Sequence, residues 1–286
     1  MCNTCGCNVT DANRHLLDEH AEPHHHHHAH DHRHGEPAPK ATGTVAVLKR
    51  LLDANDHEAA HNREHFDEHG VLAINLMSSP GSGKTRLLEA TIDALGGELR
   101  IGVIEGDLET ENDAARIRAK GVPAHQITTG TACHLDAHMV HDALHHVALQ
   151  GLDVLFIENV GNLVCPASFD LGQHRNVTLL SVTEGDDKPA KYPVMFRAAD
   201  LMLLTKTDLL AVIDEFSPER ATRAFRALAQ EGPVLAVSAK TGAGLEAWLA
   251  WLRWEVAAQK ARTAAGETVR PKIQADGVAL HAQGAA

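Results

Sequence analysis

Residues 71–85 read VLAINLMSSPGSGKT, and this stretch decides the fold. Its first residues form a nearly continuous apolar run, which is typical of a strand buried on both faces of a parallel sheet. The run leads into a phosphate-binding loop of the pattern G-x-x-x-x-G-K-S/T, with Ser78 in place of the first glycine. A helix predicted over 86–95 completes the strand, loop and helix order of this motif. We therefore predict an α/β fold of the P-loop kind, with a mostly parallel, doubly wound sheet.

Each position of the loop has a predicted task. Gly81 and Gly83 let backbone N–H groups turn toward phosphate oxygens. Lys84 is expected to reach the β- and γ-phosphates, and the Thr85 hydroxyl to bind Mg²⁺. The predicted phosphate-binding residues are Gly81, Ser82, Gly83, Lys84, Thr85 and Arg86.

The composition narrows the class of protein. The net charge of −12 argues against a nucleic-acid partner. The chain has no apolar run long enough to cross a membrane and no basic-then-apolar N-terminal signal, so we expect a soluble, cytoplasmic protein without membrane insertion. The five cysteines of a cytoplasmic chain favour metal binding or catalysis over disulfides.

Four segments differ in composition. Residues 1–40 contain too little apolar surface for a core and are expected to be a Cys/His-rich, metal-binding, disordered tail. Residues 41–70 are expected to form a helical lead-in, and 71–262 the nucleotide-binding domain. From about residue 263 to 286 apolar periodicity is lost, which predicts a disordered end.

Three cysteines lie within the first seven residues, in the pattern Cys-x-x-Cys-Gly-Cys. Gly6 lets the backbone fold so that the sulfur atoms of Cys2, Cys5 and Cys7 can face one ion. Removal of Met1 would free an amine as a fourth ligand, and a planar set of thiolate and nitrogen donors suits Ni²⁺. Tetrahedral closure would suit Zn²⁺, so both metals stay open. A redox role is disfavoured because the thioredoxin-like context is missing.

A histidine-rich tract follows these cysteines. Such tracts bind several divalent ions weakly, more as a reservoir than as one site. The alternative, a purification tag, fits poorly because the tract is internal and interrupted. The predicted storage residues are His24, His25, His26, His27, His28, His30, His32 and His34.

A second group of histidines recurs at every fourth position of the predicted lead-in helix, at His57, His61, His65 and His69. This spacing places the four rings on one face of the helix. We interpret the stripe as a solvated face, with an accessory metal site as the alternative.

A further set of metal ligands is predicted within the nucleotide-binding domain. Cys133 and His134 are expected just before, or in the first turn of, a helix that runs to about Gln150, where the helix N-terminus favours a thiolate. Cys165 follows the next predicted strand, so the three ligands come from two adjacent loops at one edge of the sheet. Ligands placed near a phosphate site can couple metal binding to the nucleotide state. The alternative is a pair of small buried cysteines.

Acidic residues at strand ends mark the other side of the phosphate site. Asp107 ends a predicted strand and is expected to hold Mg²⁺ directly or through water. Glu158-x-x-Gly161 occupies the place of the D-x-x-G element of nucleotide switches, where the glycine N–H meets the γ-phosphate. The loop after Thr183 is predicted to be a second switch, with Lys188 as a phosphate-sensing charge.

Two short elements predict that the base is guanine. Asp208 can accept hydrogen bonds from the N1–H and N2–H₂ groups of guanine, which adenine does not offer. Lys206 is expected to lay its stem along the base. Thr205 stands where this element usually has Asn, which removes an amide that braces the loop. The companion loop is predicted at Ser238, Ala239 and Lys240.

Together, the cysteine pattern, the histidine tract and the motifs SSPGSGKT, ENVGN, EGDDKP and TKTD resemble the hydrogenase nickel-incorporation GTPases, the HypB family, over nearly the full chain. The resemblance implies a GTPase of the signal-recognition-particle and MinD class that forms a homodimer with GTP. It implies delivery of Ni²⁺ to the precursor of the nickel-iron hydrogenase large subunit, with a small nickel-binding partner protein. By matching position, it implies a tight nickel site at Cys2, Cys5 and Cys7, and a nickel or zinc site at the dimer interface at Cys133, His134 and Cys165.

These expectations define a slow switch rather than a fast hydrolase, since no catalytic glutamine or arginine finger is evident. The residues expected to act on GTP are Lys84, Thr85, Asp107 and Glu158. Two rival functions are a urease-accessory GTPase, which would not explain the Cys-x-x-Cys-Gly-Cys pattern, and a nickel reservoir whose nucleotide domain is only structural.

Overall fold

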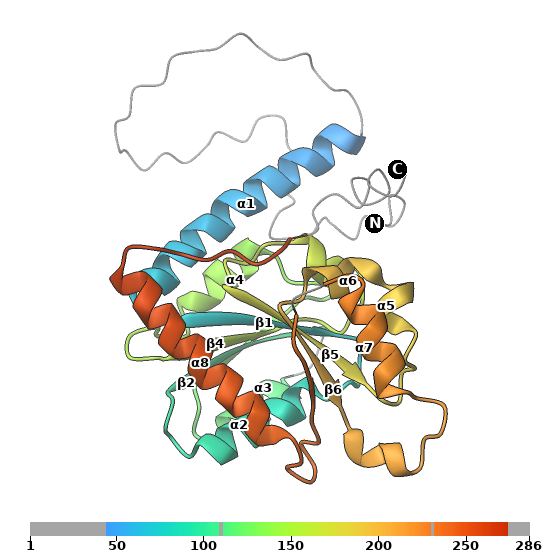
Figure 1. The fold of residues 1–286 in the computed structure, drawn as a ribbon. Helices are drawn as coiled ribbons and strands as arrows, with labels where there is room; N and C mark the ends of the chain where they lie inside the picture. The colour runs from blue at the N-terminus through green and yellow to red at the C-terminus, as the bar shows by residue number, and fades with distance from the viewer. Residues whose placement is uncertain (1–43, 109–110, 230–231, 274–286) are drawn as a thin grey trace, which may run out of the picture.

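The computed structural model describes residues 44–108, 111–229 and 232–273, with side chains from residue 51 onward (Figure 1). The predicted tail ligands Cys2, Cys5 and Cys7 lie outside the described residues, as does the histidine tract.

A single parallel sheet forms the centre of the described chain, in the order β3-β2-β4-β1-β5-β6-β7. The predicted α/β fold with a parallel, doubly wound sheet is therefore confirmed. The strands are β1 (Leu72–Ser78), β2 (Ile101–Asp107), β3 (Ala124–Thr128), β4 (Val154–Glu158), β5 (Arg175–Ser181), β6 (Leu201–Thr205) and β7 (Val234–Ala236).

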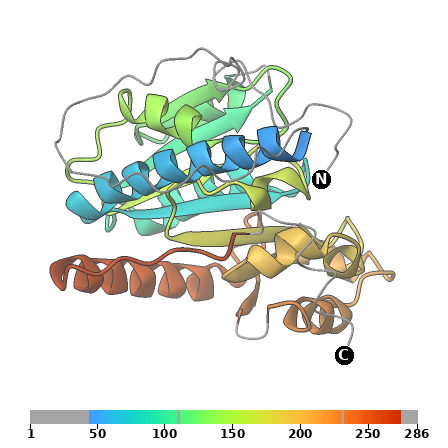
Figure 2. The ribbon, with the colours of Figure 1, turned by 90° about the horizontal axis from the view of Figure 1, so that it is seen from above.

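Helices cover both faces of this sheet, and Figure 2 shows α1 and α8 on opposite sides of it. The α-helices are α1 (Thr44–Glu68), α2 (Lys84–Leu95), α3 (Asn112–Arg118), α4 (Ala137–Leu144), α5 (Lys188–Lys191), α6 (Pro193–Ala198), α7 (Pro218–Arg226) and α8 (Leu245–Ala264). Two short 3₁₀ segments are η2 (Cys165–Ser168) and η3 (Thr207–Ala211).

The residues of β1 explain why the sheet needs both helical layers. Leu72, Ile74 and Leu76 pack into the core formed with α2 and α8. Ala73 points to the opposite face, into the core with α1 and α4, and Met77 into the core with α6 and α7. Since side chains of a strand alternate between faces, a strand that is apolar at nearly every position is buried on both sides.

The order of the strands also fixes where ligands bind. β1 lies between β4 and β5, with β2, β3 and β4 on one side of it and β5, β6 and β7 on the other. In open parallel sheets, ligands bind beyond the carboxyl ends of the strands where the winding direction reverses. The loop that follows β1 lies at this point.

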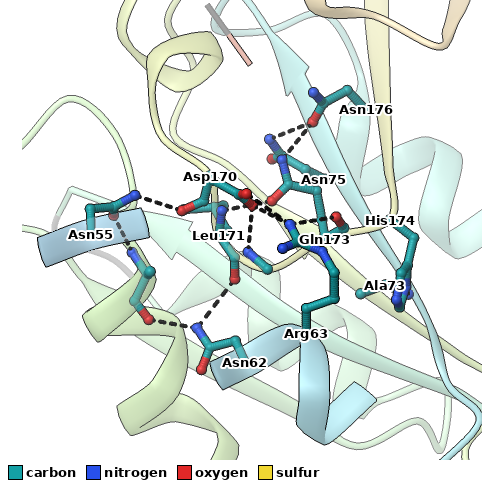
Figure 3. Close-up of polar contacts among 12 residues, drawn as sticks. Asn55, Asn62, Arg63, Ala73, Asn75, Asp170, Leu171, Gln173, His174 and Asn176 are labelled. Atoms are coloured by element: carbon teal, nitrogen blue, oxygen red, sulfur yellow. Dashed lines mark hydrogen bonds and ion pairs between the residues drawn. The ribbon is translucent and has the colours of Figure 1, made fainter. Parts of the chain in front are cut away.

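Buried polar contacts fasten α1 to the rest of the domain (Figure 3). The guanidinium of Arg63 donates hydrogen bonds of 2.6 and 2.8 Å to the two carboxylate oxygens of Asp170. The amide of Asn55 donates to the carbonyl of Asp170 at 2.8 Å. Phe66 is fully buried in the core beside them. The helical lead-in is therefore packed onto the domain as part of its folded core.

The structure corrects two predicted boundaries. The helix predicted to follow Cys133 and His134 and to run to about Gln150 is wrong at its end, because α4 spans Ala137–Leu144. Its start is set by Asp136, whose side chain accepts a hydrogen bond from the backbone nitrogen of Met139 at 2.9 Å. Cys133 and His134 thus lie in the loop before the helix, outside its first turn.

The predicted loss of order from about residue 263 does not hold for residues 263–273. Helix α8 continues to Ala264. Pro271 is buried, and the amide of Asn176 donates to the carbonyl of Lys272 at 3.3 Å. No helix among the described residues has both the length and the apolar character needed to span a bilayer.

Candidate functional site

The phosphate-binding loop joins β1 to α2 through two glycines in left-handed backbone conformation, with φ values of 73° at Gly81 and 98° at Gly83. Glycine adopts this conformation without steric cost. Lys84 is buried, and its ammonium donates to the hydroxyl of Ser78 at 3.1 Å. The Ser82 hydroxyl donates to the same oxygen at 2.5 Å. Ser78, which replaces the first glycine of the motif, thus organises the loop.

Glu158 meets the phosphate-binding loop at the end of β4. Its Oε1 accepts a hydrogen bond from the Thr85 hydroxyl at 3.0 Å and lies 3.9 Å from the Lys84 ammonium. Burial raises the pKa of Glu158, although Lys84 opposes this effect. Asp107 ends β2 as predicted, and its Oδ1 accepts from the backbone nitrogen of Leu108 at 2.7 Å.

One acidic residue of this site was not predicted from the sequence. Burial and the neighbouring Glu158 raise the pKa of Glu105 to about 11. Carboxylate oxygens of Glu105, Glu158 and Asp113 lie within 4.8 Å of one another. Such a cluster favours a cation or a shared proton, because like charges at this distance repel. The signal that could have pointed to Glu105 is its position as a glutamate inside an otherwise apolar strand.

The predicted base-binding loops border a cavity of about 310 Å³ beside the phosphate-binding loop. Asp208 has one carboxylate oxygen 2.6 Å from the donating Ser238 hydroxyl, and the other 3.9 Å from the Lys240 ammonium. The lining includes these predicted residues: Ser82, Gly83, Arg86, Lys206, Asp208, Ala239 and Lys240. The structure therefore brings the two predicted base-binding elements together.

Thr205 replaces the expected loop-bracing asparagine in an unforeseen way. Its hydroxyl donates a hydrogen bond of 2.7 Å to the carbonyl of Ser82, so the brace to the phosphate-binding loop is retained. Lys206 donates from its ammonium to the carbonyl of Gly81 at 2.7 Å. Among the described residues, Lys206 is the one non-glycine with positive φ, at 57°, a conformation that costs energy and is often found at binding sites.

Cys133, His134 and Cys165 form a second cluster, with one donor atom of each within 4.8 Å of the others. The sulfur atoms of Cys133 and Cys165 lie 3.4 Å apart, and Nδ1 of His134 lies 3.8 Å from the Cys133 sulfur. These separations suit one ion with metal–sulfur bonds of about 2.3 Å. The predicted ligand set is thus assembled, although the two cysteines are only half-buried.

The surroundings of the cluster also fit a metal ion. The His134 ring is fully buried and stacks on Phe169 with ring centroids 4.1 Å apart. Its Nε2 has no hydrogen-bond partner. Burial lowers the pKa of His134 to about 4, which keeps the imidazole neutral at pH 7, as a ligand must be. Burial, with the adjacent Cys133, raises the pKa of Cys165 to about 12, and a cation would offset this by stabilising the thiolate.

The loop that carries Cys165 lies directly against the phosphate-binding loop. The backbone nitrogen of Asn162 donates to the carbonyl of Ser78 at 2.8 Å. A Cβ atom at Gly161 would stand 2.8 Å from the backbone of Pro80, so only glycine permits this approach. Residues 159–165 therefore connect the phosphate-binding loop to Cys165, a predicted metal ligand.

Two asparagines that were not predicted reinforce this connection. Oδ1 of Asn159 accepts hydrogen bonds from the backbone nitrogens of Leu135 at 3.1 Å and Val160 at 3.0 Å. Its amide nitrogen donates to Asn75 at 3.2 Å. Both asparagines are fully buried. The signal in the sequence was Asn75, a polar residue in the middle of the apolar strand β1.

Known proteins of similar sequence identify the family. A family model described as "CobW/HypB/UreG, nucleotide-binding domain" matches residues 72–235. The hydrogenase maturation factor HypB of Rhizobium leguminosarum bv. viciae is 54% identical over 219 residues, which cover 77% of this chain and 73% of that protein. HypB of Escherichia coli (strain K12) is 52% identical over 202 residues, or 71% and 69% of the two chains. This chain belongs to the HypB family.

Solved HypB structures have the same fold as this chain. The crystal structure of HypB from Helicobacter pylori in complex with nickel matches with a TM-score of 0.69 and 44% identity, covering 72% of this chain and 97% of that one. HypB from Archaeoglobus fulgidus matches with a TM-score of 0.67 and 40% identity, covering 72% and 100%. The family predicted from the sequence motifs is confirmed.

The loop after Thr183 is the remaining predicted element of this HypB-family domain. Asp186 holds it against α7, since its Oδ2 lies 2.6 Å from the guanidinium of Arg220 and accepts from the backbone nitrogen of Ser217 at 2.7 Å. Lys188 has its ammonium 5.3 Å from the ring centroid of Tyr192. The role of this loop and of Lys188 as a switch stays a prediction.

Proposed function

We propose that this HypB-family chain is a nickel metallochaperone that uses GTP binding and hydrolysis to insert Ni²⁺ into the precursor of the nickel-iron hydrogenase large subunit. The observation that carries the proposal is the connection between two sites. Residues 159–165 include Cys165, and the same segment contacts Ser78 and Pro80 of the phosphate-binding loop. A change at the γ-phosphate that moves Gly161 also moves a metal ligand. Nickel as the cargo is supported by the related HypB structure that is described as a complex with nickel.

The geometry of Asp208 supports GTP as the nucleotide. Its carboxylate borders the cavity beside the phosphate-binding loop, where it can accept from both N1–H and N2–H₂ of guanine. Adenine presents an acceptor at N1, so bound ATP would turn a lone pair, instead of a hydrogen, toward this partly buried carboxylate.

Hydrolysis transfers the γ-phosphoryl group to water and releases GDP and phosphate. Lys84 is placed to neutralise the phosphates, and Thr85 with Asp107 or Glu158 would hold Mg²⁺, which supplies charge neutralisation at the phosphates. In this proposal GTP hydrolysis is slow, because its purpose is to change the position of the loops rather than to produce GDP and phosphate.

The half-buried cysteines leave room for a ligand from outside the chain. We include in the proposal a GTP-promoted homodimer with this cluster at its interface, a small nickel-binding partner, and action in the cytoplasm. The same donors accept Zn²⁺. Cys2, Cys5 and Cys7 would form a second, tight nickel site, and the histidine tract would store nickel.

The decisive experiment measures Ni²⁺ affinity with GDP and with a non-hydrolysable GTP analogue, by competition with a chromophoric chelator. The full chain carries Ser at positions 2, 5 and 7 and Gln for the histidines of the tract, which removes the metal ligands predicted in the tail. We expect the two affinities to differ by about 5-fold or more, the usual range of coupling between sites. Cys165→Ser should weaken binding with both nucleotides. Equal affinities with GDP and the analogue would refute the coupling.

The two rival functions have separate tests. A nickel reservoir would still supply nickel after Lys84→Ala, whereas a delivery GTPase would lose hydrogenase maturation. Urease could be a second target, because a relative that is 45% identical over 206 residues is the "Hydrogenase/urease maturation factor HypB" of Helicobacter pylori. Measuring hydrogenase and urease activity in a host that lacks its own maturation factor distinguishes these targets.

A further inference from the structure

Three histidines from two helices form a cluster separate from the cysteines. His61 and His65 are one turn apart on α1, and His141 lies on α4. One ring nitrogen of each lies within 4.8 Å of the others. The ring centroids of His61 and His65 are 4.6 Å apart, and that of His141 is 5.3 Å from His61 and 6.1 Å from His65.

Buried side chains fix the two helices relative to each other. The amide nitrogen of Asn62 donates to the carbonyl of Ala137, the first residue of α4, at 2.8 Å and to that of Leu171 at 3.2 Å. Oδ1 of Asn55 accepts from the backbone nitrogen of Ala137 at 2.9 Å. Figure 3 shows Asn55, Asn62 and Arg63 reaching from α1 into the domain. The three rings are thus held together by contacts that do not involve the rings themselves.

One further contact determines how His141 can act as a ligand. Its Nδ1 lies 3.1 Å from Oδ1 of Asn62, whose amide nitrogen is committed to the two carbonyls. Because an amide oxygen only accepts, Nδ1 carries the proton and Nε2 keeps its lone pair. Metal-binding histidines commonly have their second nitrogen fixed in this way. Glu58 adds a carboxylate 3.3 Å from Nδ1 of His141.

We propose that His61, His65 and His141 form a further site, separate from both cysteine sets, for a divalent first-row transition ion, which bridges α1 and α4. Three imidazoles suit Zn²⁺, Ni²⁺ and Cu²⁺ far better than Mg²⁺ or Ca²⁺. The side chains of His61 and His65 are 51% and 38% exposed, so an ion can enter from solvent and keep a water ligand. The site does not depend on the proposed GTPase cycle. The histidine stripe of α1 therefore has two roles in this proposal: His61 and His65 bind an ion together with His141 of α4, whereas His57 and His69 do not.

The test uses the full chain with its other sulfur and tract ligands replaced: Ser at positions 2, 5, 7, 133 and 165, and Gln for the histidines of the tract. Equilibrium dialysis with Zn²⁺, and separately with Ni²⁺, counts bound ions per chain. We expect the parent to bind one ion more than the His61→Gln/His65→Gln variant. His57→Gln is the matched control, an exposed histidine of the same helix, and should bind as the parent does. Equal stoichiometry in the parent and the double variant would overturn the site.

A second measurement tests the bridge between the helices. With Zn²⁺ about 100 times above its Kd, binding should slow the amide hydrogen exchange of α1 and α4 that occurs through their separation by about 100-fold. The double variant should show no such slowing. Slower exchange in α1 alone would contradict the bridging role of His141. Circular dichroism of the chelator-treated variants checks that they are folded.

Discussion

Oδ1 of Asn159 accepts a hydrogen bond of 3.1 Å from the backbone nitrogen of Leu135. This bond joins the loop that follows Cys133 and His134 to the loop that leads from Gly161 to Cys165. The two halves of the proposed metal-binding cluster are thus linked through one buried amide, which also lies at the end of the strand that carries Glu158.

Asn159→Ala removes this link. The variant loses the bonds to Leu135, Val160 and Asn75, which should lower the free energy of unfolding by about 1–3 kcal/mol. Chelator competition should also show weaker Ni²⁺ binding and a smaller difference between GDP and GTP-analogue states. Asn75→Ala is the control, because it leaves the bond between Asn159 and Leu135 intact. If both variants keep the wild-type difference, Asn159 does not transmit the nucleotide state.

Gly161→Ala should displace the phosphate-binding loop. The new Cβ atom would stand 2.8 Å from the backbone of Pro80, so the loop must move away by a fraction of an ångström to about 1 Å. A shift of this size should lower the rate of GTP hydrolysis by about 10- to 100-fold. Phosphate release measures this rate. Gly97→Ala is the control, since it has backbone strain at φ +88° but no neighbour within 4 Å and lies beyond the far end of α2. Equal rates of GTP hydrolysis in the two variants would show that the close contact between Gly161 and Pro80 is not needed for hydrolysis.

Asp208→Asn should change which base is bound. An amide offers one acceptor and one donor where the carboxylate offers two acceptors, so GDP affinity should fall by about 10- to 100-fold. Xanthosine diphosphate, whose base has a carbonyl in place of the guanine amino group, should gain affinity. Fluorescent-nucleotide displacement measures both. Asp214→Asn, the same change at an exposed position nearby, should alter neither. If the GDP affinity of Asp208→Asn is unchanged, the guanine base does not bind at Asp208.

Acid should weaken the packing of α1 through His174. Nδ1 of this buried ring accepts from the backbone nitrogen of Ala73 at 3.0 Å, and Nε2 lies 3.1 Å from Asp67. Burial lowers the pKa of His174 below the ordinary 6.5, and the bond to Asp67 only partly opposes this. The unfolded chain therefore takes up a proton first, and the stability that His174 contributes above pH 6.5 is lost as the pH falls below it.

The measurement for His174 is urea unfolding at pH 7.5 and pH 5. His174→Gln should be less stable than wild type by about 1–3 kcal/mol at pH 7.5, with a smaller penalty at pH 5. Exposed His57→Gln should show no such change. A penalty for His174→Gln that is the same at both pH values would contradict the shift.

The sequence predicted the elements whose chemistry is local. The phosphate-binding loop needs only a strand, two glycines, Lys84 and Thr85 in order, so its motif suffices. Cys133 and Cys165 were correctly placed close together, because they follow the parallel strands β3 and β4, whose carboxyl ends lie at the same edge of the sheet on either side of β2. The exact start of α4 was harder to predict, since the capping contact of Asp136 decides it.

Features that depend on packing between distant segments were not predictable in this way. The Thr205 hydroxyl could be recognised as a brace only after the loop of Ser82 was placed beside it. The histidines of α1 read as a solvated stripe because nothing local shows that His141 lies against them. Glu105 and Asn159 lie in or directly after apolar strands, where periodicity assigns a core role to every position.

The bond between Arg63 and Asp170 spans 107 positions of the chain. During synthesis, α1 is made first but cannot dock until the chain beyond Asp170 has left the ribosome. At about 5–20 residues per second this delay is roughly 5–20 seconds, during which Phe66 has no core to enter. The cluster of His61, His65 and His141 is consequently absent from a nascent chain and is completed only when the domain closes.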